Sequence, residues 1–112
     1  MSELNSTELL YLAAKPTTEQ IAKAAHALGW PHPRARRWRR VNWTKPWRNY
    51  YAGTSTCPDW LALRALGMAV LVRPEGGELM PYAVWRVSPL GRECIKVRLL
   101  AIRGALRAGR AP

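Results

Sequence analysis

The chain has 112 residues, which is the usual length of one domain, and 48% of them are hydrophobic, which excludes a chain disordered throughout. Eighteen Lys and Arg residues against seven Asp and Glu give a net charge of +11. No apolar stretch approaches the length of a membrane-spanning helix, and no N-terminal run reads as a signal peptide. We therefore expect a single soluble domain in the cytoplasm, with Cys57 and Cys94 reduced and packed in its core.

The positive charge is concentrated in two zones of the chain. Residues 34–58 carry seven Lys or Arg residues and no acid, and residues 88–112 carry a net charge of +5. A molecule with two such zones attracts polyanions through its summed field. DNA, RNA, an acidic membrane surface and an acidic protein all qualify, and we expect nucleic acid first, with DNA favoured.

Two short helices are predicted before the first basic zone, one from Asn5 to about Ala14 and one ending at Leu28. Each begins with a Ser/Thr/Asn and Glu/Gln pair at capping-box spacing. The two pairs are Asn5 with Glu8 and Thr17 with Gln20. Gly29 lies just past the second helix, where a left-handed cap is wanted.

A proline-rich, basic segment follows, which we call the insert (residues 30–51). Pro31, Pro33 and Pro46 forbid one continuous helix. We expect residues 34–40 to form no more than a turn or two of helix, and residues 48–52 to form a short strand.

The rest of the chain reads as helix, hairpin and helix. Thr56, Pro58 and Asp59 predict the start of a helix that Gly67 ends. Residues 68–72 are predicted to form a buried strand, residues 74–78 a turn, and residues 82–87 the second strand of a hairpin. Ser88 is expected to cap a last, amphipathic helix over residues 89–108, with Pro89 at its first position.

This last part resembles the back half of bacterial winged-helix regulators. The resemblance rests on Leu63-Arg-Ala-Leu-Gly-Met, the hairpin, and Tyr82-Ala-Val-Trp-Arg-Val-Ser-Pro-Leu-Gly, and it extends over residues 48–100 to small winged-helix-like proteins of phages and prophages. It implies one α+β domain over residues 1–112, with three or four helices and a two- or three-stranded antiparallel wing. By analogy, the helix before the wing would read DNA, and that helix carries Asp59 and only one base, Arg64.

One feature departs from that family. The two helices of a helix-turn-helix are joined by a turn of about three or four residues. Here 29 residues separate Leu28 from Pro58. Either the insert holds short elements of its own, or the second helix of the motif has been replaced.

The insert is the first candidate site. We expect its cations to bind phosphates, since seven like charges within a short segment repel one another without a counter-charge. Its tryptophans are more in keeping with burial in the core, although an indole face also stacks on unpaired bases. The predicted nucleic-acid-binding residues are Arg34, Arg36, Arg37, Arg39, Arg40, Lys45, Arg48, Arg64, Trp38 and Trp43, and Trp47 is the third indole within the basic run.

The last helix is the second candidate. Its basic stripe consists of Arg92, Lys96, Arg103 and Arg107, opposite an apolar arc that is wider than a small core needs. Such an arc favours a homodimer contact over a membrane-surface contact, because no aromatic anchor lies within the helix. The hairpin balances Arg73 and Arg86 with Glu75 and Glu78, so we expect a structural wing.

No pattern indicates an enzyme, a cofactor or a metal site. Cys57, Cys94, His26 and His32 include no closely spaced ligand pair, and the acids show no clustering. We therefore predict a non-enzymatic, phosphate-dominated nucleic-acid-binding protein that acts as a phage or prophage regulator of transcription. The alternative is a protein-binding module, such as a phage-encoded, anti-CRISPR-like inhibitor of a host defence complex, which would use the insert against an acidic protein surface.

Overall fold

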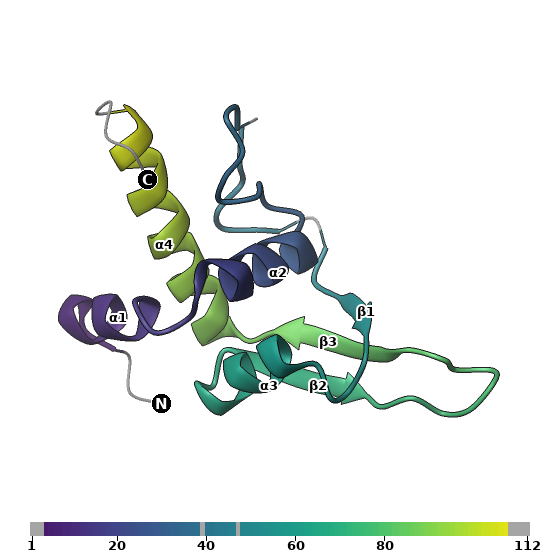
Figure 1. Ribbon diagram of the computed structural model, residues 1–112. Coiled ribbons are helices and arrows are strands. Elements are labelled where there is room, and N and C mark those ends of the chain that lie inside the picture. Colours follow the sequence, from purple (N-terminus) through teal and green to yellow (C-terminus); the bar gives the residue numbers. More distant parts are fainter. Residues whose placement is uncertain (1–3, 39, 47, 108–112) are drawn as a thin grey trace.

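The computed structural model describes residues 4–38, 40–46 and 48–107 and has an α+β architecture (Figure 1). Four helices and a three-stranded antiparallel sheet make up its regular structure within those ranges, as predicted. In chain order the elements are α1 (Ser6–Ala13), α2 (Thr18–Leu28), β1 (Tyr51–Gly53), α3 (Pro58–Ala65), β2 (Ala69–Arg73), β3 (Ala83–Val87) and α4 (Pro89–Arg107).

The helix starts follow the predicted capping chemistry, with one exception. Both capping boxes are formed, and Gly29 adopts the left-handed conformation with φ of 72°. The exception is α3, whose N-cap is Cys57 and which has no side-chain cap, so that Pro58 at the first turn is its main start signal. Within residues 34–38 and 40, the structure has a turn at Arg34, a bend at Arg36 and no helix, so the expected turn or two of helix is absent from these described residues.

The sheet has the strand order β1-β3-β2, so the hairpin strand β3 lies in the centre. The predicted first strand is displaced toward the C-terminus and begins at Tyr51, which pairs with Trp85. The reason lies in Asn49, whose side chain accepts a hydrogen bond from the backbone N–H of Val87 and donates one to the carbonyl of Val87, both 2.9 Å. The side-chain amide of Asn49 thus makes the two hydrogen bonds that a backbone residue would make to Val87, two residues before the strand begins.

The prediction that residues 68–72 form a buried strand is wrong for two of its five side chains. Among the described elements, helices pack on one face of the sheet, so Ala69 is buried while Val70 and Val72 are each about half exposed (50% and 51%). An apolar run is typical of a strand covered on both faces, and no described element covers the second face of this strand.

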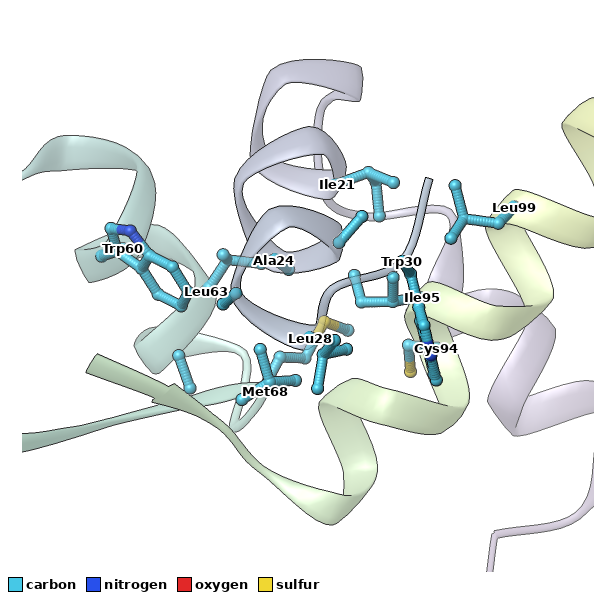
Figure 2. Packing of buried hydrophobic residues seen from close by; sticks show 14 of the residues in the cluster. Ile21, Ala24, Leu28, Trp30, Trp60, Leu63, Met68, Cys94, Ile95 and Leu99 are labelled. Carbon is cyan, nitrogen blue, oxygen red and sulfur yellow. The ribbon is translucent and has the colours of Figure 1, made fainter. Parts of the chain in front are cut away.

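The core lies where α2 passes between α3 and α4 above the sheet (Figure 2). Alanines on α2 let both neighbouring helices approach closely, and Ile21 and Leu28 fill the centre. On the α3 side the indoles of Trp60 and Trp85 stack, with ring centroids 5.7 Å apart and planes inclined by 16°. Both side chains are fully buried.

Ser88 and Gly91 explain the junction between the hairpin and α4. The Ser88 hydroxyl donates to the carbonyl of Gly67 (2.6 Å) and accepts from the backbone N–H of Gly91 (3.0 Å), so it caps α4 and holds the end of α3 at once. A Cβ at position 91 would lie 2.1 Å from the carbonyl oxygen of Met68. The Ser-x-x-Gly pattern therefore reflects a close backbone approach that admits no side chain.

This close approach predicts opposite effects of the same substitution at two positions of one helix. Gly91→Ala should lower the free energy of unfolding by about 1–3 kcal/mol, because the added methyl forces the backbones apart. Gly104→Ala should be neutral or stabilise by up to about 1 kcal/mol, because a Cβ there meets no atom within 4 Å and alanine favours helix. Urea denaturation of both variants measures the difference, and equal effects would contradict the packing described.

Candidate functional site

Indole contacts hold the insert against the core. The insert leaves the end of α2 and runs in the same direction as the C-terminal half of α4 (Figure 1). Trp30 is 6% exposed, and its ring meets that of Trp43 edge to face with centroids 5.1 Å apart. Trp43 meets Trp38 in the same manner at 6.5 Å. Trp38 and Trp43 are half-buried against the core, so burial is confirmed in part for these two indoles.

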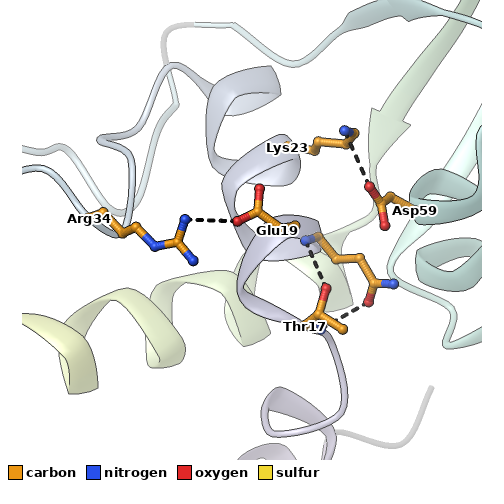
Figure 3. A network of polar contacts seen from close by, with 6 residues as sticks. Thr17, Glu19, Lys23, Arg34 and Asp59 are labelled. Atoms are coloured by element: carbon orange, nitrogen blue, oxygen red, sulfur yellow. Dashed lines mark hydrogen bonds and ion pairs between the residues drawn. The ribbon is translucent and has the colours of Figure 1, made fainter. Parts of the chain in front are cut away.

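Two cations of the insert hold its backbone in place. Arg34 forms an ion pair with Glu19 of α2 at 3.0 Å, with both side chains well exposed (Figure 3). The Nε of Arg48 donates at 3.1 Å to the carbonyl of His26 in the last turn of α2, which also accepts the backbone N–H of Gly29 at 3.1 Å. Both residues were predicted to bind phosphate, and both already have structural partners.

Three of the four remaining described cations of the insert line an open hollow. Arg37, Arg40 and Lys45 line it together with the backbone at Gly29, and its volume is about 490 Å³. All three side chains are exposed. Arg39 and Trp47 lie outside the described residues.

Two further hollows lie between the insert and α4. Arg36 and Trp38 face Arg103 and Arg107 across a hollow of about 260 Å³. The guanidinium of Arg103 lies 5.8 Å from the centroid of the Trp38 ring, within reach of a cation–π contact.

The larger of these two hollows lies at Trp43. Its lining residues are Arg40 and Trp43 of the insert, Lys96 of α4, Val41 and Thr44, and its volume is about 670 Å³.

A fourth hollow, of about 320 Å³, brings together cations from the insert, β3 and α4. Its basic lining residues are Arg48, Arg86 and Arg92.

The four hollows adjoin one another, because the first shares Ala35, Arg40 and Pro46 with the other three in turn. Ten of the described lining residues are Arg or Lys and none is Asp or Glu. We call this continuous face the insert–α4 surface. Its cations are Arg36, Arg37, Arg40, Lys45, Arg48, Arg86, Arg92, Lys96, Arg103 and Arg107.

Arg86 is a member of this surface that the sequence interpretation assigned to a neutral wing. It follows the fully buried Trp85 on β3, so alternation places it on the outer face of the sheet. The alternation is visible in the sequence, but the proximity of β3 to the start of α4 is not. Arg98 is the opposite case, a cation of α4 that donates to the carbonyls of Ala13 (2.9 Å) and Pro16 (2.7 Å).

Arg64 is not brought together with the other predicted site residues. It lies exposed on α3, which contributes no residue to the four hollows. Asp59 of the same helix forms an ion pair with Lys23 at 3.2 Å (Figure 3), and the hydrogen bond from this pair raises the pKa of Lys23. In the hairpin, Glu75 accepts a hydrogen bond from the backbone N–H of Ser55. The helix α3 carries one acid and one base, and the hairpin carries two of each. The two elements to which the family resemblance assigns DNA contacts are therefore close to neutral.

The apolar arc of α4 is largely occupied within the chain. Cys94, Ile95 and Leu99 are fully buried, and the helix packs on α1, α2 and β3. Leu100 and Leu106 are 41% and 37% exposed. A homodimer through this helix stays a prediction, and light scattering across a concentration series gives the mass that decides it.

Metal ligands do not gather within the described part of the chain, where no group of three His, Cys, Asp or Glu residues is placed to hold an ion. The same part of the chain contains no helix that is both long and apolar enough to cross a bilayer.

Comparison with protein-family models, with curated proteins and with solved structures finds no match to this chain.

The thiol of Cys94 is predicted to be inert in the folded protein. Burial raises its pKa to about 11, because the core disfavours the charged thiolate. At pH 8.5 we therefore expect iodoacetamide to leave Cys94 unmodified until the protein is unfolded in urea, whereas a free thiol alkylates readily. Mass spectrometry of peptides with and without urea checks this, and alkylation of Cys94 under native conditions at the rate seen in urea would refute it.

Proposed function

We propose that the protein is a non-enzymatic nucleic-acid-binding protein, with DNA as the favoured ligand, and that the insert–α4 surface holds the phosphate backbone. The observation that carries the proposal is the assembly of ten cations from the insert, β3 and α4 around adjoining hollows that no described acid lines. Two zones that are separate in the sequence thus supply one face.

Electrostatics favours an external anion at this face. Like charges held side by side repel one another, and water and salt screen that repulsion only in part. Most cations of the surface are arginines, which contact phosphate with two parallel hydrogen bonds. A polyanion laid along the face would relieve the repulsion and release its own condensed counterions, which is the main source of non-specific affinity for nucleic acid.

The winged-helix resemblance extends the proposal to a regulator of phage or prophage type. A three-stranded antiparallel sheet after a helix is compatible with a wing. The near-neutral α3 and hairpin indicate that affinity does not come from the helix that would read DNA by analogy. Phosphate contacts fix position on the nucleic acid but carry no sequence information.

One observation favours a second candidate function, a module that binds an acidic protein. The insert–α4 surface is basic while α3 and the hairpin, which a sequence-specific regulator would use, are not. An inhibitor of a host defence complex would place the same cations on an acidic protein face. Absence of nucleic-acid binding at low salt, together with a stoichiometric protein complex that survives nuclease treatment, would favour this function.

Removal of cations from the insert–α4 surface should weaken binding far more than removal of cations elsewhere. The test variant combines Arg36→Ala, Arg37→Ala and Arg40→Ala, and the matched control combines Lys15→Ala, Arg64→Ala and Arg73→Ala. Both lower the net charge by three, and the control residues line none of the four hollows. Fluorescence anisotropy with a labelled DNA, measured from 50 to 200 mM salt, compares the two variants with the wild type.

For the wild type, neutralisation of about five or six phosphates predicts a fall in affinity on the order of a thousandfold over that salt range. The test variant should reduce the slope of log K against log salt by about two to three, and the control should leave it nearly unchanged. Equal losses in both variants would show that net charge alone is responsible. A flat salt dependence, or no binding at 50 mM salt, would refute the proposed function.

A further inference from the structure

We propose that the hollow at Trp43 receives an unpaired base, and that the preferred ligand of the protein is therefore single-stranded nucleic acid. This inference rests on the proposed function and names the form of nucleic acid that the insert–α4 surface takes. It is carried by one half-buried indole that lines the same hollow as two cations from different parts of the chain, Arg40 of the insert and Lys96 of α4.

The indole of Trp43 is held in place while part of it stays accessible. Trp30 and Trp38 contact it edge to face, with interplanar angles of 66° and 60°. The side chain is half-buried against the core, yet it lines a hollow of about 670 Å³. That volume falls within the range of small-ligand sites, and an immobilised aromatic ring gives up little conformational entropy on stacking.

The rim of the hollow is also fixed. The side-chain oxygen of Asn42 accepts hydrogen bonds from the backbone N–H and the hydroxyl of Thr44, at 3.2 and 2.8 Å, and from the backbone N–H of Lys45 at 3.1 Å. This turn holds the chain on either side of Trp43 in one conformation. The hollow is thus a preformed site lined by one aromatic ring and by two cations, Arg40 and Lys96.

Such a site suits an unpaired nucleotide better than a duplex. In a duplex both faces of each base are stacked on neighbouring bases, so an indole in a hollow finds no free face. In a single strand the base stacks on the ring, and its two flanking phosphates extend toward cations such as Arg40 and Lys96. Stacking of this kind tolerates any base, which agrees with a surface that contains many phosphate-binding groups.

Trp38 is the matched indole that is not free to do this. Its ring nitrogen donates to the carbonyl of Ala35 at 3.0 Å, and the guanidinium of Arg103 lies over its ring. Trp38 also contacts Trp43 edge to face, so its substitution would disturb the proposed site. The control is instead Tyr82, an exposed aromatic residue of the hairpin that lines none of the four hollows.

The first experiment uses the wild-type protein and three labelled DNA probes with equal numbers of phosphates. The probes are a thymine single strand, the same strand without its bases (abasic), and a duplex. We expect the thymine strand to bind on the order of ten- to a hundredfold more tightly than the abasic strand, which corresponds to one stacked base. We also expect it to bind more tightly than the duplex.

The second experiment assigns the effect to one ring. Trp43→Leu should reduce thymine-strand binding to the abasic level, Trp43→Phe should retain most of it, and Tyr82→Leu should keep the preference for the strand with bases. Thermal melting of each variant records any loss of folding, and the wild-type probe comparison stands even if Trp43→Leu does not fold.

The outcomes separate the two proposals. Strong, salt-dependent binding with equal affinity for the thymine and abasic strands would overturn the base site and leave the proposed function intact. Tighter binding of the duplex than of the thymine strand would do the same. If none of the three probes binds at low salt, the proposed function itself is overturned.

Discussion

The insert keeps a fixed course because the burial of indoles opposes the repulsion of its charges. Seven Lys and Arg residues follow one another between Arg34 and Arg48 without an acid, so the segment by itself favours an extended, solvated chain. Trp30, Trp43 and Trp38 form a chain of edge-to-face contacts that runs from the core into the segment. Each such pair stabilises the folded chain by about 0.5–1.5 kcal/mol beyond what the burial of its surface contributes. The cations of the insert therefore lie on one face because these indole contacts anchor the segment to the core.

The last helix provides the opposite wall of that face, and its rotation about its own axis is fixed at two points. Near its start, Gly91 packs against the carbonyl of Met68 and Ser88 bonds both Gly67 and Gly91. Further along, Arg98 bonds the carbonyls between α1 and α2. These contacts direct the apolar stripe into the core and leave the basic stripe facing the insert, so a core-packing requirement also determines where the charges lie.

The elements could be predicted because their signals are local. Capping pairs, Gly29 and Pro89 act within a few residues, and the structure confirms them. The errors come from partners distant in the sequence. Asn49 takes a ladder position that delays β1 to Tyr51, and Val70 is exposed because no described element covers the second face of the sheet.

The same distinction holds for the candidate site. Composition identified both basic zones and most of the cations that line the hollows. It could not show that Arg34 and Arg48 have partners on α2, that Arg64 stands apart, or that Arg86 belongs to the face. Those facts depend on how α2, β3 and α4 pack, and no spacing in the sequence encodes them.

The position of the charge bears on what the winged-helix resemblance can mean. A fold carries different functions when sites are placed on different parts of it. In this chain, Asp59 forms an ion pair with Lys23 beside α3, and the sheet contributes only Arg86 to the basic face. The long connection between α2 and α3 and the helix α4 supply the other cations. Under the proposed function, phosphates and unpaired bases would therefore bind at the insert–α4 surface, away from the helix and hairpin that the winged-helix resemblance points to.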